Sequence, residues 1–226
     1  MLKINDYKTK ILLQNQHIKQ LLILDSCSSC LDLAASWPRS QTLILSEQQT
    51  AGRGQNNKSW LSPKHTGIWA SYIIKQNYPA LAIKAALALA ISLEELGCPP
   101  SIKIKWPNDV YLNKQKTAGI LIEGKNIGGI QTWAIGIGIT YLDVELPGIQ
   151  PLAKHWPECC TREQLISTWV TNFQNLLPEN NIAELFQHYD LLQGHNIAGG
   201  QAAGINNQGQ LLVKTSKGII TLNRSH

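Results

Sequence analysis

The segment "IKIKWPNDVYLNKQKTAGILIE", residues 102–123, contains the clearest succession of sheet signals in the chain. Residues 102–109 begin with alternating apolar and basic side chains, which predicts a strand, and Pro107 stops it because proline cannot donate to a sheet ladder. Residues 110–123 predict a β-hairpin that turns near 113–115. Neighbouring antiparallel strands are therefore expected in this part of the chain.

Further strands are indicated on either side of this segment. Apolar runs bounded by turn residues predict them at 21–25, 42–48, 67–74 and 132–140. A short helix is expected after the first of these strands, capped by Ser26 or Ser28 and ended by Pro38. Beyond Gly194 the chain consists of short strand-like runs between Gly and Asn turns, without a helix signal. This end of the chain predicts a small β unit.

Two longer helices are predicted. Residues 79–97 are apolar nearly all round, with Pro79 placed in the first turn and Gly97 at the C-terminal end. A helix of this kind is expected to pack under a sheet rather than to carry function. A capping-box pattern, Thr161 to Gln164, begins the other helix at 161–177.

Composition narrows the classes of protein that the chain can belong to. The chain has 226 residues, of which 15% are charged, which is typical of a globular protein. No apolar run reaches the roughly 18 residues of a membrane span, and the N-terminus lacks the pattern of a signal peptide. The net charge of +5 is spread along the chain, so it allows an anionic substrate without indicating nucleic acid. A soluble, cytoplasmic protein is expected.

The cysteines allow several interpretations. Five cysteines, an odd number, argue against a disulfide scaffold. Cys27 and Cys30 form a C-x-x-C at the start of a predicted helix, a pattern that resembles a thiol–disulfide site because a helix N-terminus lowers a thiol pKa. Zinc is an alternative, with Cys159 and Cys160 as distant ligands, although adjacent cysteines do not form the usual second half-site. Inert thiols are the simplest interpretation.

The polar loop "EQQTAGRGQNNKSW", residues 47–60, is the first of three segments that combine cations with glycines. Gly52 and Gly54 allow close backbone approach to a ligand, and Arg53 between them carries a fork suited to phosphate or carboxylate. The second is "KWPND", which presents polar groups at a strand end, and the third is "KTAGILIE". Each segment taken alone is also explained as an ordinary surface turn, cap or bulge.

Taken in order, these segments resemble one family. "DSCSS", "SEQQTAGRGQNNKSWLSP", "KWPNDVYLNKQKTAGILIE" and "IGIGIT" are similar to biotin–protein ligases over residues 21–142. The resemblance implies an α+β fold with a class II aminoacyl-tRNA synthetase-like catalytic domain, residues 1–193, built on a mixed, largely antiparallel sheet. It also implies a small SH3-like C-terminal β domain, for which residues 194–226 are short.

The resemblance further implies a two-step reaction. Biotin and ATP would give biotinyl-5′-AMP and pyrophosphate, with Mg²⁺ assisting, and biotin would then pass to a lysine of the biotin carboxyl carrier domain of acetyl-CoA carboxylase or a similar carboxylase. The catalytic residues would be Arg53 and Lys116, at the biotin carboxylate and the phosphate, and Asp109, either as a magnesium ligand or as an aid to deprotonating the carrier lysine. The biotin site would comprise Ser26, Cys27, Ser28, Gln49, Gly52, Arg53, Gly54, Gln55, Lys116, Gly119, Gly136 and Gly138. The ATP and adenylate site would comprise Arg53, Trp60, Asn108, Lys116 and Thr140, with Trp60 closing the loop over the ligand.

Three positions depart from the family's usual pattern. Ser26-Cys27-Ser28 stands where the family has Ser-Thr-Asn, so Cys27 is expected to line the biotin site. Gln55 replaces an arginine that would hold the adenylate, so a faster leak of biotinyl-AMP is expected. Thr140 ends the "GIGI" pattern where an asparagine is usual, which removes an amide contact.

Partners and rival functions follow from the same comparison. Residues 1–20 are too few for the helix-turn-helix domain of some family members, so we expect a monofunctional ligase without DNA binding. No membrane partner is expected, and a homodimer is left open. The alternatives are a lipoate–protein ligase of the same fold, a C-x-x-C thiol–disulfide oxidoreductase, and a non-catalytic module that keeps the biotin pocket.

Overall fold

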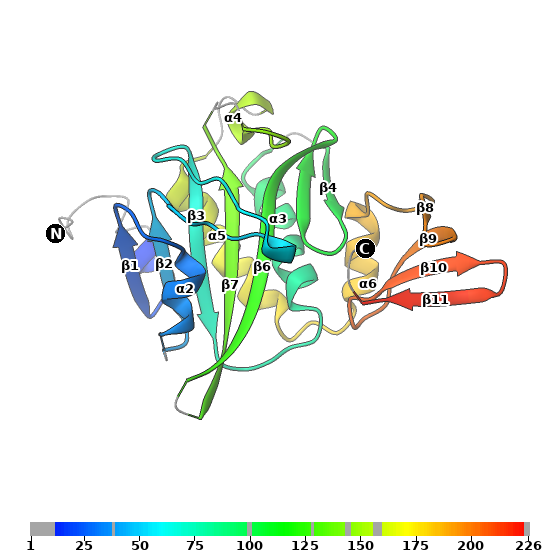
Figure 1. The fold of residues 1–226 in the computed structure, drawn as a ribbon, viewed down its shortest axis with the longest axis horizontal. Coiled ribbons are helices and arrows are strands. Elements are labelled where there is room, and N and C mark those ends of the chain that lie inside the picture. The colour runs from blue at the N-terminus through cyan, green and yellow to red at the C-terminus, as the bar shows by residue number, and fades with distance from the viewer. Residues whose placement is uncertain are drawn as a thin grey trace.

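The computed structural model describes most of the chain as one seven-stranded sheet, helices on both of its faces and a smaller C-terminal sheet (Figure 1). The described residues are 12–37, 39–98, 101–127, 129–142, 146–155 and 160–223. The large sheet has the strand order β1 (Gln20–Leu24), β2 (Thr42–Ser46), β3 (Gly67–Ile74), β7 (Ile130–Thr140), β6 (Gln115–Ile127), β5 (Asp109–Leu112) and β4 (Ile102–Lys105).

The sheet is mixed and largely antiparallel, as predicted. β1 runs parallel to β2, and each other neighbouring pair is antiparallel. The hairpin of β5 and β6 turns at Asn113 and Lys114, which both have positive φ angles of 50° and 65°, the conformation that a two-residue hairpin turn requires. β4 ends at Lys105, before Pro107. The predicted strand 102–109 therefore comprises β4, a turn and the first residue of β5.

Helices α3 (Leu81–Glu95) and α5 (Arg162–Leu176) cover one face of the sheet. α3 is buried along most of its length, as its apolar composition predicts, and the indole of Trp169 in α5 donates to the Ala85 carbonyl at 3.0 Å. The capping box at Thr161 is present. The N-terminus of α3 differs from the prediction: Ala80 is its N-cap, with a left-handed φ of 57°, so Pro79 precedes the helix instead of lying in its first turn.

A short helix, α2 (Cys30–Ala35), packs on the opposite face of the sheet together with the polar loop. Its N-cap is Ser29, which corrects the prediction that Ser26 or Ser28 caps it. The loop after β2 crosses in front of β7 and β6 and contains one turn of 3-10 helix, η1 (Gln55–Asn57) (Figure 1). This face of the sheet, opposite α3 and α5, carries the functional candidates.

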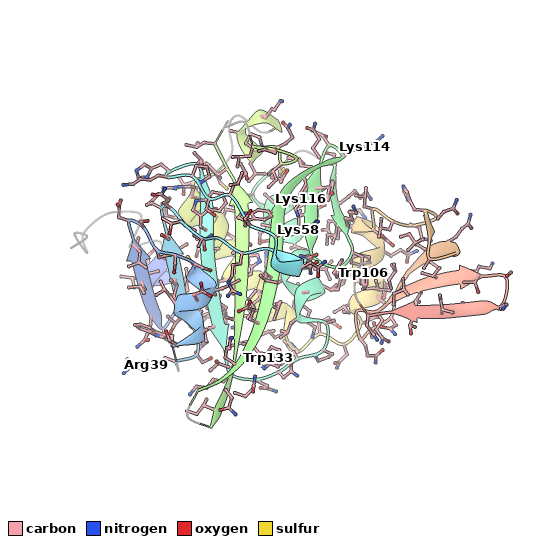
Figure 2. The ribbon with its side chains drawn as sticks, in the orientation of Figure 1. Arg39, Lys58, Trp106, Lys114, Lys116 and Trp133 are labelled. Atoms are coloured by element: carbon pink, nitrogen blue, oxygen red, sulfur yellow. The ribbon has the colours of Figure 1, made fainter. Side chains whose placement is uncertain are left out.

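The C-terminal part forms a four-stranded antiparallel sheet, as predicted. Its strands are β8 (Asn196–Ile197), β9 (Gly200–Ile205), β10 (Leu211–Thr215) and β11 (Gly218–Leu222). This sheet lies beside α6 (Ile182–Tyr189), a helix that was not predicted. A still shorter helix, α4 (Leu152–His155), lies earlier in the chain, before α5. Trp106 links the two sheets, because its indole donates to the Gly209 carbonyl at 2.9 Å (Figure 2).

Several expectations fall outside the described residues. They concern most of the N-terminal arm, residues 1–11, and Pro38 and Cys159. None of the helices in the described parts of the chain has the length and apolar character that a membrane crossing demands.

Candidate functional site

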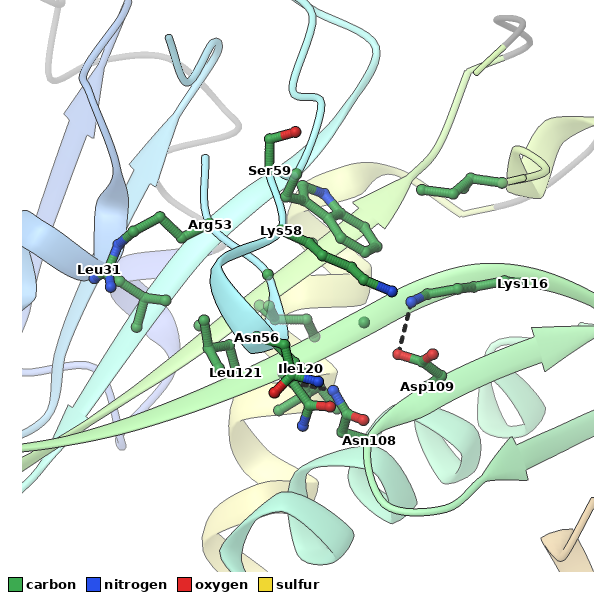
Figure 3. Close-up of a pocket in the computed structure, with 18 of the residues that line it drawn as sticks. Leu31, Arg53, Asn56, Lys58, Ser59, Asn108, Asp109, Lys116, Ile120 and Leu121 are labelled. Atoms are coloured by element: carbon green, nitrogen blue, oxygen red, sulfur yellow. Dashed lines mark hydrogen bonds and ion pairs between the residues drawn. The ribbon is translucent and has the colours of Figure 1, made fainter. Parts of the chain in front are cut away.

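A cavity of about 510 Å³ lies between the polar loop, the end of β4, and strands β5, β6 and β7 (Figure 3). The expected site residues on its wall are Gln49, Arg53, Gly54, Gln55, Trp60, Asn108, Asp109, Lys116, Gly119, Gly136 and Gly138. These side chains come from segments that are far apart in the sequence. The order of strands in the sheet brings them together, because β6 and β7 pair so that Gly119 lies opposite Gly138.

Trp60 occupies the slot that the paired glycines leave open. A Cβ atom at Gly138 would lie 2.5 Å from Trp60 Nε1, and one at Gly119 would lie 2.9 Å from the same indole ring. Both distances are shorter than any normal contact, so the indole lies directly on the backbone of β6 and β7. Trp60 Nε1 is buried without a hydrogen-bond partner among the described residues. A buried donor of this kind is costly unless another group satisfies it.

Several lysines line the cavity near the Trp60 indole. Lys116 Nζ forms an ion pair with Asp109 Oδ1 at 2.8 Å and lies 5.0 Å from the Trp60 ring centroid. Figure 3 shows the ammonium groups of Lys58 and Lys116 pointing toward one another. Lys105 also lines the cavity, and neither Lys58 nor Lys105 forms an ion pair within the described part of the chain. Three cations and one carboxylate therefore face a common space, which favours an anionic ligand.

Arg53 points away from these lysines, toward α2 (Figure 3). Its guanidinium contacts Asp32 Oδ1 at 2.7 Å and both Glu123 carboxylate oxygens, at 2.5 and 2.9 Å. The hydrogen bonds that Arg53 donates to Glu123 raise the pKa of Arg53 above its already high value. The arginine thus fastens the polar loop to α2 and β6, and it does not converge with Lys116 in this structure.

Asn108 is held by the wall of the cavity itself. Its side-chain Nδ2 donates to the Ile120 carbonyl at 2.6 Å, and its own carbonyl accepts from the Ile120 N–H at 3.0 Å. The residue is 6% exposed. These two bonds align the start of β5 with β6, where Asp109 pairs with Gly119 and its carboxylate reaches Lys116.

The end of the cavity nearest α2 is lined by Ser29, Leu31 and Gln49. Gln49 Oε1 accepts from the Cys30 N–H at 2.8 Å, and Gln49 Nε2 donates to Ser62 Oγ at 2.9 Å, so both ends of the amide are already bonded. Ser29 Oγ is buried without a partner among the described residues. Leu31 lies against Gly136, where an added Cβ would meet it at 2.8 Å.

Five expected site residues are not among those that line the cavity. Ser26, Cys27 and Ser28 precede the first turn of α2, and Ser29 takes the position at the cavity because the helix begins one residue later than expected. Gly52 packs against the Trp60 backbone within the loop, since a Cβ there would lie 2.4 Å from the Trp60 carbonyl oxygen. Thr140 is buried at the end of β7, where it pairs with Gly67.

Some residues on the cavity wall were not predicted as site residues. Lys105 belongs to the segment "KWPND" and Lys58 to the polar loop, so both lysines lie close in sequence to expected site residues, which was the available signal. Ser29 also lines the cavity and is the last residue of the motif "DSCSS". Leu31 and the short segment 147–149 line the cavity too, and no motif pointed to them.

A zinc site receives no support from the structure. The described residues contain no group of three or more His, Cys, Asp and Glu side chains that could hold a metal ion. Cys159 lies outside the described residues, as noted above.

Known proteins resemble the chain in both sequence and fold. The model of the biotin/lipoate A/B protein ligase family matches residues 25–140. The bifunctional ligase/repressor BirA of Bacillus spizizenii is 30% identical over 240 residues, which cover 94% of this chain and 73% of that protein. A biotin–[acetyl-CoA-carboxylase] ligase of Paracoccus denitrificans is 36% identical over 102 residues, 42% of each chain.

Solved structures give the same result for the fold. The biotin protein ligase of Aquifex aeolicus in complex with biotin and ATP has a TM-score of 0.79 at 23% identity, and the match covers 91% of this chain and 96% of that one. The biotin protein ligase of Leishmania major in complex with biotinyl-5-AMP has a TM-score of 0.67 at 20% identity, covering 91% and 99%. The expected α+β, synthetase-like fold is thereby confirmed. The chain is a member of the biotin/lipoate A/B protein ligase family.

Proposed function

We propose that the chain is an ATP-dependent biotin–protein ligase, which makes biotinyl-5′-AMP and transfers biotin to a lysine of a biotin carboxyl carrier domain. The observation that carries the proposal is the position of Lys116. Its ammonium group contacts Asp109 and the Trp60 ring, beside Lys58, at the cationic end of a cavity whose other end is lined by the uncharged side chains of Ser29, Leu31 and Gln49. A ligand that is neutral at one end and anionic at the other matches this arrangement.

The cationic end suits formation of an acyl-adenylate. A biotin carboxylate oxygen would attack the α-phosphorus of ATP, and the bond from that phosphorus to the pyrophosphate oxygen would break. Both reactants are anions, so positioning and charge neutralisation are the main tasks of the protein. Lys116, with Lys58 and Lys105 on the same cavity, supplies the cations for both.

The transfer step requires a neutral amine. The carrier lysine would attack the acyl carbon of the adenylate, AMP would leave, and the amine would lose a proton. Asp109 is the acid among the described residues that line the cavity, and it is ion-paired to Lys116. Once Lys116 binds phosphate groups, its ion pair with Asp109 weakens, and the Asp109 carboxylate can accept that proton.

The neutral end suits the ureido ring of biotin. Ser29 Oγ is buried on this wall without a hydrogen-bond partner among the described residues, whereas the amide of Gln49 is fully engaged in holding α2. We therefore assign the ureido contact to Ser29, with Gln49 positioning it. Leu31 and Gly136 leave an apolar slot for the thiophane ring and its chain.

Magnesium is compatible with the site as a nucleotide-bound ion. Mg²⁺ commonly takes one or two carboxylates and fills its remaining positions with phosphate oxygens and water. Asp109 offers one such carboxylate, at the price of its ion pair with Lys116. The ion would draw charge from the phosphates, while this chain positions them.

Biotin is preferred over lipoate as substrate. The ligase of Paracoccus denitrificans and the solved structures named above are described as biotin ligases, which supports this choice. The carrier protein, the cytoplasmic location and a homodimer remain predictions. A thiol–disulfide oxidoreductase would not use Lys116, and a non-catalytic module would bind biotin without transferring it.

Transfer of labelled biotin to a carrier domain, with ATP, tests the proposal. We expect transfer by the wild type and a loss of roughly a hundredfold or more in Lys116→Ala, because the ammonium acts on charge that develops in the reaction. Lys125→Ala, an exposed lysine on the same strand β6, is the matched control and should transfer normally. The same assay with lipoate in place of biotin distinguishes a biotin ligase from a lipoate–protein ligase. Wild-type protein without transfer, or full activity in Lys116→Ala, would refute the mechanism.

A further inference from the structure

Two thiols lie against each other at the N-terminus of α2, outside the wall of the cavity. Cys27 Sγ and Cys30 Sγ are 3.9 Å apart, and Cys30 Sγ also lies 3.4 Å from the Trp69 carbonyl oxygen. A disulfide bond brings two sulfur atoms to about 2.05 Å, so Cys27 Sγ and Cys30 Sγ must move closer together before a bond can form. The ligase reaction proposed above uses neither thiol.

The two thiols differ in a way that assigns them separate roles. Cys27 is partly exposed, and the hydrogen bond from Cys30, aided by one from Ser46, lowers its pKa to about 6. Cys30 is 1% exposed, and the same hydrogen bond together with burial raises its pKa. Cys27 is therefore the thiolate that an oxidant meets, and Cys30 is positioned to resolve the product.

The main chain around these thiols is tied to the polar loop. The Cys27 N–H donates to the Gln48 carbonyl at 3.1 Å, and the Cys27 carbonyl accepts from the Thr50 N–H at 2.9 Å. The Cys30 N–H donates to the Gln49 side chain at 2.8 Å. Closing a bond between the two sulfur atoms would pull on the first turn of α2, where Ser29 and Leu31 line the cavity.

We infer that Cys27 and Cys30 form a reversible disulfide on exposure to a peroxide, and that this bond weakens ligand binding at the α2 end of the cavity. The bond is a property of the two thiols alone, whereas its effect on biotin rests on the proposed function. Oxidation of the two thiols would thus inhibit the ligase reaction of the chain.

The chemistry balances with hydrogen peroxide as the oxidant. The Cys27 thiolate attacks one peroxide oxygen, the O–O bond breaks, and the departing hydroxide takes up a proton as water, leaving Cys27 as a sulfenic acid. The Cys30 sulfur then attacks the Cys27 sulfur, and the sulfenic oxygen leaves as a second water with the Cys30 proton. The two thiols lose two electrons, which the peroxide gains. A dithiol such as dithiothreitol reverses the bond by exchange.

The test uses full-length protein before peroxide, after peroxide, and after peroxide followed by dithiothreitol. Trypsin releases residues 20–39 as one peptide that contains both cysteines and no other. Mass spectrometry should find this peptide with an internal disulfide after peroxide and with free thiols after reduction. Biotin affinity, measured by calorimetry, should fall by roughly tenfold on oxidation and recover on reduction, which corresponds to the loss of about one hydrogen bond at the α2 end of the cavity.

Variants are compared by the ratio of oxidised to reduced affinity, so their basal affinity does not matter. Cys27→Ser and Cys30→Ala should each give a ratio near one, and Cys160→Ser, the matched control, should behave as the wild type. The inference is wrong if the peptide forms no disulfide, or if the oxidised wild type binds biotin as tightly as the reduced form. If the reduced wild type binds no biotin, the proposed function fails instead. Hydrogen–deuterium exchange over residues 26–35 then decides whether the bond alters the first turn of α2.

Discussion

Gln55 lies in η1 on the wall of the cavity, at a position where the resemblance to biotin–protein ligases implies an arginine. A guanidinium at this place would form charge-assisted hydrogen bonds to an adenylate phosphate, which glutamine forms more weakly. We expect Gln55→Arg to slow release of biotinyl-AMP by roughly tenfold, in line with hydrogen bonds to charged groups. A chase experiment on preformed, labelled adenylate measures this rate.

Gln76→Arg provides the charge-matched control for that variant. Gln76 is exposed on the surface and does not line the cavity, so its replacement should leave the release rate unchanged. Equal release rates for wild type and Gln55→Arg would contradict the role given to position 55.

Cys27 gives a pH prediction at the same scale. The hydrogen bond from Cys30 is the largest cause that lowers the pKa of Cys27 from 9.0 to about 6. The thiolate fraction, and with it the rate of alkylation by iodoacetamide, should rise as pH increases through about 6, so that Cys27 is mostly thiolate at neutral pH. Peptide mapping after timed alkylation between pH 5 and 9 measures the midpoint.

Cys30→Ala removes the hydrogen bond that causes this shift. The alkylation midpoint of Cys27 should then move up toward the ordinary value of a thiol, near 8.5. A midpoint that is the same in both proteins would show that the hydrogen bond does not set the reactivity of Cys27.

At the level of elements, the polar loop after β2 depends on one glycine for its path. Gly52 meets the Trp60 backbone so closely that any side chain would collide, whereas Gly54 has 3.3 Å to the Lys58 carbonyl. The Trp60 N–H also donates to the Gly52 carbonyl at 2.8 Å. The loop therefore holds the indole on β6 and β7 through contacts between its own two ends.

Gly52→Ala should displace Trp60 and impair the site more than it destabilises the fold. We expect biotin transfer to fall by roughly tenfold to a hundredfold, since the positioning of the indole is lost, and the free energy of unfolding to fall by about 1–3 kcal/mol. Transfer kinetics and urea unfolding measure the two effects. Gly54→Ala, in the same loop, should change both much less. A Gly52→Ala protein as active as Gly54→Ala would contradict this account of the loop.

The same loop is also fastened from the side. Arg53 joins it to Asp32 in α2 and to Glu123 in β6. Because these side chains are partly exposed, such ion pairs are usually worth only about 1 kcal/mol or less each. The path of the loop therefore depends mainly on the contacts between Gly52 and Trp60, and the ion pairs of Arg53 add little to the free energy of unfolding.

In the whole molecule, the two sheets share one apolar core. Leu211 and Val213 of β10 belong to the same buried cluster as Trp106 and Phe186. The chain also pairs with the edge of the main sheet just after α6, where the Leu191 N–H donates to the Ile104 carbonyl at 3.0 Å. These contacts predict that the C-terminal sheet and the rest of the chain unfold together.

Leu211→Ala tests this coupling. Leu211 is 1% exposed, and its truncation should lower the free energy of unfolding by about 2–5 kcal/mol. All seven tryptophans precede residue 194, so tryptophan fluorescence reports on the larger part, including Trp106 at its contact with Gly209 of the C-terminal part. We expect the fluorescence midpoint to shift with the circular-dichroism midpoint. Ile219→Ala, 66% exposed on the same sheet, should cost no more than about 0.5 kcal/mol. An unchanged fluorescence midpoint in Leu211→Ala would mark residues 194–226 as an independent domain.

Local patterns in the sequence were sufficient for much of the fold. The hairpin turn at Asn113 and Lys114 and the capping box at Thr161 were predictable because they depend on residues adjacent in the chain. The helix α6 was missed, since eight residues carry too little periodicity to stand out. The start of α3 was misplaced because Ala80 adopts a left-handed conformation that no residue preference predicts.

The sequence by itself determined the family, the alternation of strands and helices, and eleven of the residues on the cavity wall, because motif residues near the ends of strands remain together wherever the sheet forms. Only the tertiary structure decided how those residues are used. It bonded both ends of the Gln49 amide, turned Arg53 toward α2 and brought Ser29 to the wall in place of its neighbours. These outcomes depend on distances between segments far apart in the chain, and hydrogen-bond partners at such distances leave no local signal.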